Sequence, residues 1–196
     1  MPTRGKQDGA PPADRLLDSA AELFDSEGIR AVGIDRLISE ADVARASLYQ
    51  HFGSKDALVV AYLERTDRRD RAAYAHAVRE LGGRPLGRIR AVFTSAATSA
   101  ERRNYRGCLY VNALTEFPDD DHPVRRVVLD HRQWLVDELV AALEQIGVPD
   151  PRALAARIQL IYDGALVGSK AVRDASPITN AAALVDEMVL SASPAP

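Results

Sequence analysis

The segment from Gly33 to Lys55, GIDRLISEADVARASLYQHFGSK, decides the fold of this chain. Its apolar residues recur every three or four positions in two short runs, which are separated at Asp42 and end at Gly53. Such spacing is typical of amphipathic helices, and such breaks are typical of turns and helix ends. The segment therefore predicts two short helices joined by a tight turn.

A helix, a turn of a few residues and a second short helix form the geometry in which one helix crosses the DNA backbone and the next enters the major groove. Arginine and glutamine bond base edges, alanine contacts a thymine methyl group, and hydroxyl, imidazole and ammonium groups donate to phosphates. The candidate DNA contacts are Arg45, Ala46, Ser47, Tyr49, Gln50, His51 and Lys55. An ordinary helical hairpin is the alternative interpretation of this pattern.

The rest of the chain carries the same helical signals and no pattern typical of a strand. Apolar spacing, helix caps and prolines predict further helices over residues 14–27, 54–81, 107–117, 123–146, 151–173 and 177–191, with another that begins at Pro85. We expect an all-α protein of about nine helices. Its predicted parts are a flexible arm over 1–13, a three-helix DNA-binding domain over 14–60 and a larger helical domain over 61–192.

Net charge gives no support for a nucleic-acid partner. The chain carries 25 Lys and Arg against 28 Asp and Glu, which leaves a formal charge of -3. The position of the charge is more informative, because the window from Val43 to Lys55 contains no acid but does contain Arg45, His51 and Lys55. This window is therefore the part of the chain whose charge suits phosphate contact.

Composition excludes several other classes of protein. No run approaches the roughly 20 apolar residues that a membrane helix needs, and Met1 to Pro12 lacks the apolar core of a secretion signal, so we expect a cytoplasmic protein. A single cysteine, Cys108, can form neither an internal disulfide nor a cysteine metal cluster. His122 and His131 lack the spacing of a metal-ligand pair, and Cys108 has no base at helical-neighbour spacing. We expect no cofactor, no metal and no catalytic site.

The N-terminal segment contains, in order, Leu23-Phe24, Gly28, Ile34-Asp35, Ala41-Asp42-Val43, Ser47-Leu48-Tyr49, His51-Phe52, Ser54-Lys55 and Ala57-Leu58. In the order and spacing of these residues, over about residues 14 to 60, it bears a resemblance to the TetR family of transcriptional repressors. The resemblance implies that the helix with Ser47 and Tyr49 reads an operator and that Tyr49 and Lys55 touch phosphates. It also implies a helical C-terminal domain that dimerises and binds a small inducer.

This sequence departs from the family pattern at three positions. Asp42 stands where the turn glycine is usual, Ala44 where a capping Ser or Thr is frequent, and Gly33 where the helix often starts with Thr or Ser. Aspartate tolerates a left-handed turn, and a lost cap costs about 1 kcal/mol of local helix stability. None of the three departures removes a candidate DNA contact. A weaker resemblance to one branch of the family continues over Arg106 to Ala113 and around Phe117, His122 and Trp134.

The C-terminal helices contain two further sets of candidates. Apolar or buried polar positions that are suited to an inducer pocket are Phe93, Cys108, Asn112, Trp134, Tyr162 and Asp163, for which core packing or an internal hydrogen bond is the alternative. Small and apolar residues suited to a dimer interface are Gly164, Gly168, Leu184 and Met188, which equally fit the chain's own core.

We therefore expect a ligand-responsive DNA-binding regulator that binds a palindromic double-stranded operator as a homodimer, acts as a repressor and is released by a small-molecule inducer. The long helix after Ser54 touches both domains and is the expected relay. A helical DNA-architectural protein without an inducer is the alternative. A small helical enzyme that uses Cys108 or His131 has no support in the sequence.

Overall fold

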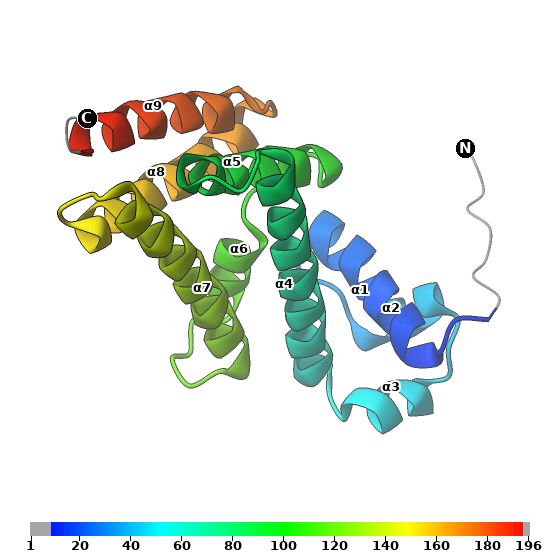
Figure 1. Ribbon diagram of the computed structural model, residues 1–196. Helices are drawn as coiled ribbons and strands as arrows, with labels where there is room; N and C mark the ends of the chain where they lie inside the picture. The colour runs from blue at the N-terminus through cyan, green and yellow to red at the C-terminus, as the bar shows by residue number, and fades with distance from the viewer. Residues whose placement is uncertain (1–8, 194–196) are drawn as a thin grey trace. The chain divides into compact units, whose positions relative to one another are not determined.

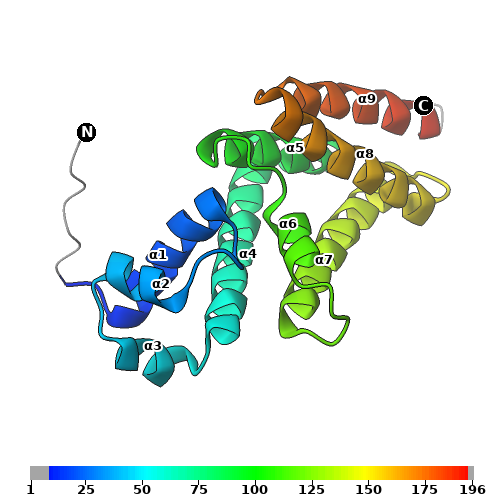
Figure 2. The same ribbon diagram turned by 180° about the vertical axis from the view of Figure 1, so that it is seen from behind.

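The computed structural model describes residues 9–193, and within that range the chain is all-helical, as the sequence predicts (Figures 1 and 2). Residues 1–8 of the expected arm lie outside the described residues. None of the helices within residues 9–193 is long and apolar enough to cross a membrane. The helices are α1 Pro12–Glu27, α2 Ile34–Ala41, α3 Arg45–Phe52, α4 Lys55–Glu80, α5 Pro85–Arg102, α6 Leu109–Glu116, α7 Pro123–Ile146, α8 Pro151–Val172 and α9 Ser176–Ala192.

Local signals account for most helix ends. Ser54 Oγ accepts from the amide of Ala57 at 3.1 Å, which caps α4, and Asp150 Oδ1 accepts from the amide of Ala153 at 3.0 Å, which caps α8. Asp42 ends α2 in the left-handed conformation, with φ 51° and ψ 51°. Ala44 supplies no side-chain cap to α3. The predicted turn at Asp42 is therefore confirmed.

Contacts divide the chain into two compact units. Among the described residues, the first contains 9–65 together with 113–127, and the second contains 66–112 together with 128–193. The first unit therefore extends beyond the domain expected over 14–60, because it also takes the end of α6 and the start of α7. Helices α4, α6 and α7 each contribute residues to both units.

The N-terminal unit is organised around α1. This helix packs on α2 and α3, and its residues Leu16 and Leu23 are buried with Leu37 of α2 and Leu48 of α3. Ser19 of α1 is also buried, and its hydroxyl donates to the carbonyl of Leu37 at 3.2 Å. One fully buried leucine thus fixes each of the two helices of the predicted helix-turn-helix against α1.

The turn that follows α1 is held by two side chains of opposite charge. The carboxylate of Glu116, at the end of α6, accepts from the amides of Ile29 and Arg30 at 3.0 and 2.6 Å. The ammonium of Lys55, at the start of α4, donates to the carbonyl of Ile29 at 2.7 Å and to that of Arg30 at 3.4 Å. The guanidinium of Arg30 lies 5.2 Å from the ring centre of Phe117. These contacts explain why residues 113–127 belong to the N-terminal unit.

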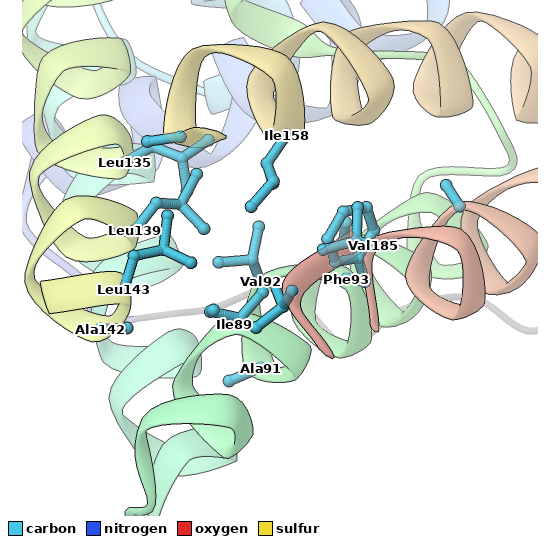
Figure 3. Close-up of a cluster of buried hydrophobic side chains, with 14 of the residues drawn as sticks. Ile89, Ala91, Val92, Phe93, Leu135, Leu139, Ala142, Leu143, Ile158 and Val185 are labelled. Atoms are coloured by element: carbon cyan, nitrogen blue, oxygen red, sulfur yellow. The ribbon is translucent and has the colours of Figure 1, made fainter. Parts of the chain in front are cut away.

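The C-terminal unit has its own apolar core. Side chains from α5, α7, α8 and α9 converge there, and among them Ile89, Leu139, Leu143, Ile158 and Val185 are almost fully buried (Figure 3). Helix α9 packs against both α8 and α5. The core of this unit is therefore independent of the residues that form the N-terminal unit.

The contact between Glu116 and the turn generates a testable prediction. Replacing Glu116 with Ala removes both acceptor oxygens, so the amides of Ile29 and Arg30 each lose a hydrogen bond to a charged group, worth about 1.5–3 kcal/mol. Replacing Glu116 with Gln removes the charge but keeps one acceptor oxygen. Hydrogen exchange at Ile29 and Arg30 should become about tenfold faster or more in the alanine variant, and less so in the glutamine variant.

The matched control is Glu144→Gln, since Glu144 is an exposed acid on α7 in the C-terminal unit. Exchange rates at Ile29 and Arg30 that stay unchanged in both Glu116 variants would show that the carboxylate does not hold the turn.

Candidate functional site

The outer face of α3 gathers the predicted DNA contacts. Arg45, Ala46, Tyr49, Gln50 and His51 are exposed. Ser47 is half-buried, whereas Leu48 is fully buried and anchors the helix. Tyr49 is notable because it is a large aromatic residue and yet 46% of its surface is exposed to solvent. The structure thus brings six of the seven predicted residues together on one short helix.

Arg45 is engaged by an acid of the same unit. Its guanidinium forms an ion pair with the carboxylate of Asp35, which lies in the first turn of α2. Both side chains are more than half exposed, so the pair contributes little to stability. The guanidinium of Arg45 is thus at the surface of α3 and held by a single exposed carboxylate.

Lys55 differs from the other predicted contacts because it is half-buried and hydrogen-bonded to the turn after α1. Burial lowers the pKa of Lys55, an effect that the nearby carboxylates of Asp56 and Glu116 oppose. An ammonium has three N–H donors, so contacts with two carbonyls do not exhaust its capacity. The sequence predicted a phosphate contact at Lys55 and missed this structural role.

The C-terminal unit contains a cavity of about 430 Å³. It is lined by residues of α4, α5, α7 and α8 and by the segment that begins α6. Cys108, Trp134 and Tyr162 line it, as predicted. Burial raises the pKa of Cys108, so its side chain stays a neutral thiol. The volume falls in the range of small-molecule sites.

The other three predicted pocket residues do not line this cavity. Phe93 packs in the core with its ring edge-on to Tyr162, at a centroid distance of 5.9 Å. The amide of Asn112 donates to the carbonyl of Arg106 at 3.0 Å. Asp163 forms an ion pair with Arg132, in which an oxygen lies 2.6 Å from a guanidinium nitrogen. Core packing and internal bonding account for these three residues.

Sequence reasoning missed a polar cluster at the cavity wall. The hydroxyl of Tyr110 donates to Asp70 Oδ2 at 2.7 Å, and Nδ1 of His131 lies 2.7 Å from Asp67 Oδ1. The rings of Tyr110 and His131 stack with centroids 3.6 Å apart. Burial raises the pKa of Asp70 and lowers that of His131, although Asp67 opposes the second effect. The cluster thus pairs a phenol with one carboxyl group and an imidazole with another.

A signal for this cluster was present in the sequence. Residues 65–71 interleave arginines with Asp67 and Asp70, a pattern typical of a solvated, ion-paired helix face, and Arg71 does pair with Asp67 at 2.7 Å. Asp67, Asp70 and Tyr74 are spaced by three and four residues, however, so they share one side of α4. That side faces inward, and the cavity wall includes Asp70 and Tyr74.

The predicted interface residues fall into two groups. No atom lies within 4 Å of the Cβ position of Gly164, whereas that of Gly168 lies 3.2 Å from Pro177 at the start of α9. Leu184 is 48% exposed, whereas Met188 packs against the core. Gly168 and Met188 therefore serve contacts within the chain. The free apolar face of α8 and α9 consists of Leu160, Gly164, Val167 and Leu184.

Comparison with known proteins places this architecture in a family. Residues 16–62 match the model for bacterial regulatory proteins of the tetR family. Residues 85–185 match the model for the tetracyclin repressor-like C-terminal domain. Together the two matches include α3, most of the cavity wall and the apolar face of α8 and α9.

Several relatives match along most of their length. The crystal structure of SCO4454, a TetR-family transcriptional regulator from Streptomyces coelicolor, superposes with a TM-score of 0.85 at 37% identity, covering 93% of this chain and 97% of that chain. The transcriptional regulator AcuR of Cereibacter sphaeroides is 28% identical, over 86% of this chain and 83% of its own.

The transcriptional repressor NemR of Escherichia coli is 27% identical, over 90% of this chain and 92% of its own. All three relatives are transcriptional regulators. The family models and the relatives agree with the helix-turn-helix and with the helical C-terminal unit. The chain belongs to the TetR family and is a DNA-binding transcriptional regulator.

Proposed function

We propose that this protein is a homodimeric repressor that binds a palindromic operator and leaves it when a small molecule occupies the cavity of the C-terminal unit. The observation that carries the proposal is the solvent-facing side of α3, where donors for bases and phosphates surround the exposed phenol of Tyr49. Such a repressor acts where the operator lies, in the cytoplasm.

Two copies are required because one short helix reads only a half-site. In helix-turn-helix dimers the two recognition helices lie about one DNA turn apart and read an inverted repeat. Leu160 is 72% exposed and Val167 is 64% exposed, and because they are seven residues apart they lie on the same face of α8. With Leu184 of α9 they form an apolar surface that a second copy would bury in a four-helix contact.

Release by a ligand follows if the ligand prefers the conformation that binds DNA poorly. The operator affinity must then fall by the same factor by which DNA weakens ligand binding. Helices α4 and α6 support such coupling, because Lys55 and Glu116 hold the turn after α1 while Tyr74 and Tyr110 of the same helices line the cavity. The cavity favours this function over that of an architectural protein without an inducer.

DNA binding should depend on Tyr49. Replacing Tyr49 with Ala removes a phosphate donor from each copy, and a hydrogen bond to a charged group is worth about 1.5–3 kcal/mol. We expect at least about a tenfold loss of affinity for a duplex selected from a random pool, measured by fluorescence anisotropy, with folding and dimerisation unchanged.

Leu129→Ala is the control, because Leu129 is equally exposed at 48% but lies on α7. If the affinity of the Tyr49 variant matches that of the control, α3 is not the reading helix.

Dimerisation should depend on Leu160. Replacing it with Asp leaves the monomer intact, since the side chain is exposed there, but places two carboxylates in the proposed interface. The dimer dissociation constant, measured by analytical ultracentrifugation, should rise by about a hundredfold or more, because each copy loses about 1.5–3 kcal/mol of apolar burial.

The control variant is Leu129→Asp, which adds the same charge at an exposed leucine of α7 and should remain a dimer. Equal dimer dissociation constants for the two variants would place the interface elsewhere.

A further inference from the structure

An acid of α2 contacts the first residue of α3. The carboxylate of Asp35 pairs with the guanidinium of Arg45, which lies ten positions further along the chain. The side chain of Asp35 is 82% exposed and that of Arg45 is 51% exposed, so both groups lie at the surface of the helix-turn-helix. Because the window from Val43 to Lys55 contains no acid, Asp35 brings a negative charge to a surface that otherwise has the charge for DNA contact.

Packing and the turn fix the positions of the two helices that carry this pair. Leu37 of α2 and Leu48 of α3 are fully buried, so each helix is anchored on its inner side. In the turn between them, the amide of Val43 donates to the carbonyl of Ile38 at 3.1 Å. The ion pair therefore joins two helices whose relative position is already determined by other contacts.

The guanidinium of Arg45 has donors for a further partner. Arginine carries five N–H donors in a planar fork, and Arg45 uses Nη2 for its contact with Asp35. A second side of the fork matches the two acceptors of a guanine, N7 and O6, in the major groove. Arg45 is the first residue of α3, and the N-terminal residues of a recognition helix are those that contact base edges.

A phosphate suits this ion pair less well than a guanine does. The pair carries no net charge, and a phosphate that contacted the guanidinium would also approach the carboxylate of Asp35. Two anions that are so close repel each other. The edge of a guanine offers two uncharged acceptors, so it accepts from Arg45 without that repulsion. The carboxylate thus favours a base over a phosphate as the partner of Arg45.

The next arginine of the sequence provides a contrast. Arg36 of α2 pairs with Glu40 at 3.7 Å and with Glu27 at 3.8 Å. Glu40 lies one turn further along α2, and Glu27 is the last residue of α1. Arg36 and Glu40 therefore form an exposed pair of the same chemical kind within α2, which makes them a matched control for Arg45 and Asp35.

We propose that Arg45 reads a guanine in each half-site, and that Asp35 is the positioning residue that holds its guanidinium for the base and weakens its attraction to phosphates. This inference rests on the proposed function in one respect, namely that α3 enters the major groove. It assigns one base to one side chain, and it gives an acid of α2 a function in specificity.

Replacing Arg45 with Lys tests the base contact. Lysine keeps the positive charge but lacks the planar fork that donates to two acceptors at once. Selection from a random duplex pool with the unaltered full-length protein should enrich a G·C pair at one position of each half-site. In Arg45→Lys the preference for that pair should fall at least about fivefold. Arg36→Lys, the control, should keep it.

Replacing Asp35 with Asn tests the positioning residue. Arg45 is then available to phosphates, so affinity for a duplex of random sequence should rise about three- to tenfold at low salt. A plot of log affinity against log salt concentration should become steeper by about 0.9 per copy, because one more phosphate is neutralised. The preference for guanine should fall at the same time. Glu40→Gln removes the same charge from the same helix and should leave the slope and the preference unchanged.

Several results would overturn the inference. A guanine preference that survives in Arg45→Lys would refute the base contact, and equal salt slopes for Asp35→Asn and Glu40→Gln would refute the positioning role. A lower melting temperature of Asp35→Asn together with weaker binding to random DNA would show that Asp35 only stabilises the start of α3.

The same selection separates this inference from the proposed function. An enriched inverted repeat with no guanine that depends on Arg45 would contradict the inference and leave the proposed function standing. An enriched single site whose guanine is lost in Arg45→Lys would support the inference and contradict the palindromic operator. Absence of any enriched sequence would contradict both.

Discussion

The hydrogen bonds that hold the turn after α1 are the constraint on which the positions of α2 and α3 depend. Its peptide groups at Ile29 and Arg30 lie between a carboxylate that accepts from their amides and an ammonium that donates to their carbonyls. Lys55 begins α4 and Glu116 ends α6, and both residues lie far from this turn in the sequence. Because α2 and α3 follow the turn directly, the position of α3 is tied to the start of α4 and the end of α6.

The helices themselves could be predicted because their signals are local. Ser54 and Asp150 cap helices with their side chains, prolines open α5, α7 and α8, and Asp42 adopts the left-handed turn that its short polar side chain tolerates. The contact of Glu116 with Ile29 could not be predicted. It joins residues 87 positions apart, and nothing in the segment around Glu116 distinguishes it from an exposed acid.

The two halves of the candidate site differ in the same way. On α3, the buried Leu48 and the exposed Tyr49 follow from helical periodicity and from the need of a short helix to anchor one side. In the C-terminal unit, core and cavity residues share the inward side of each helix. Periodicity alone therefore could not separate Phe93, which packs in the core, from Ser95, which reaches the cavity.

The central claim is that this regulator reads a palindromic sequence as a dimer. Selection of bound sequences from a random duplex pool, with the purified full-length protein at moderate salt, tests it most directly, because salt determines how much non-specific binding survives. We expect enrichment of an inverted repeat whose half-site centres lie about ten base pairs apart or a multiple of that. Failure of a folded, dimeric protein to enrich any sequence, or enrichment of a single unrepeated site, would contradict it.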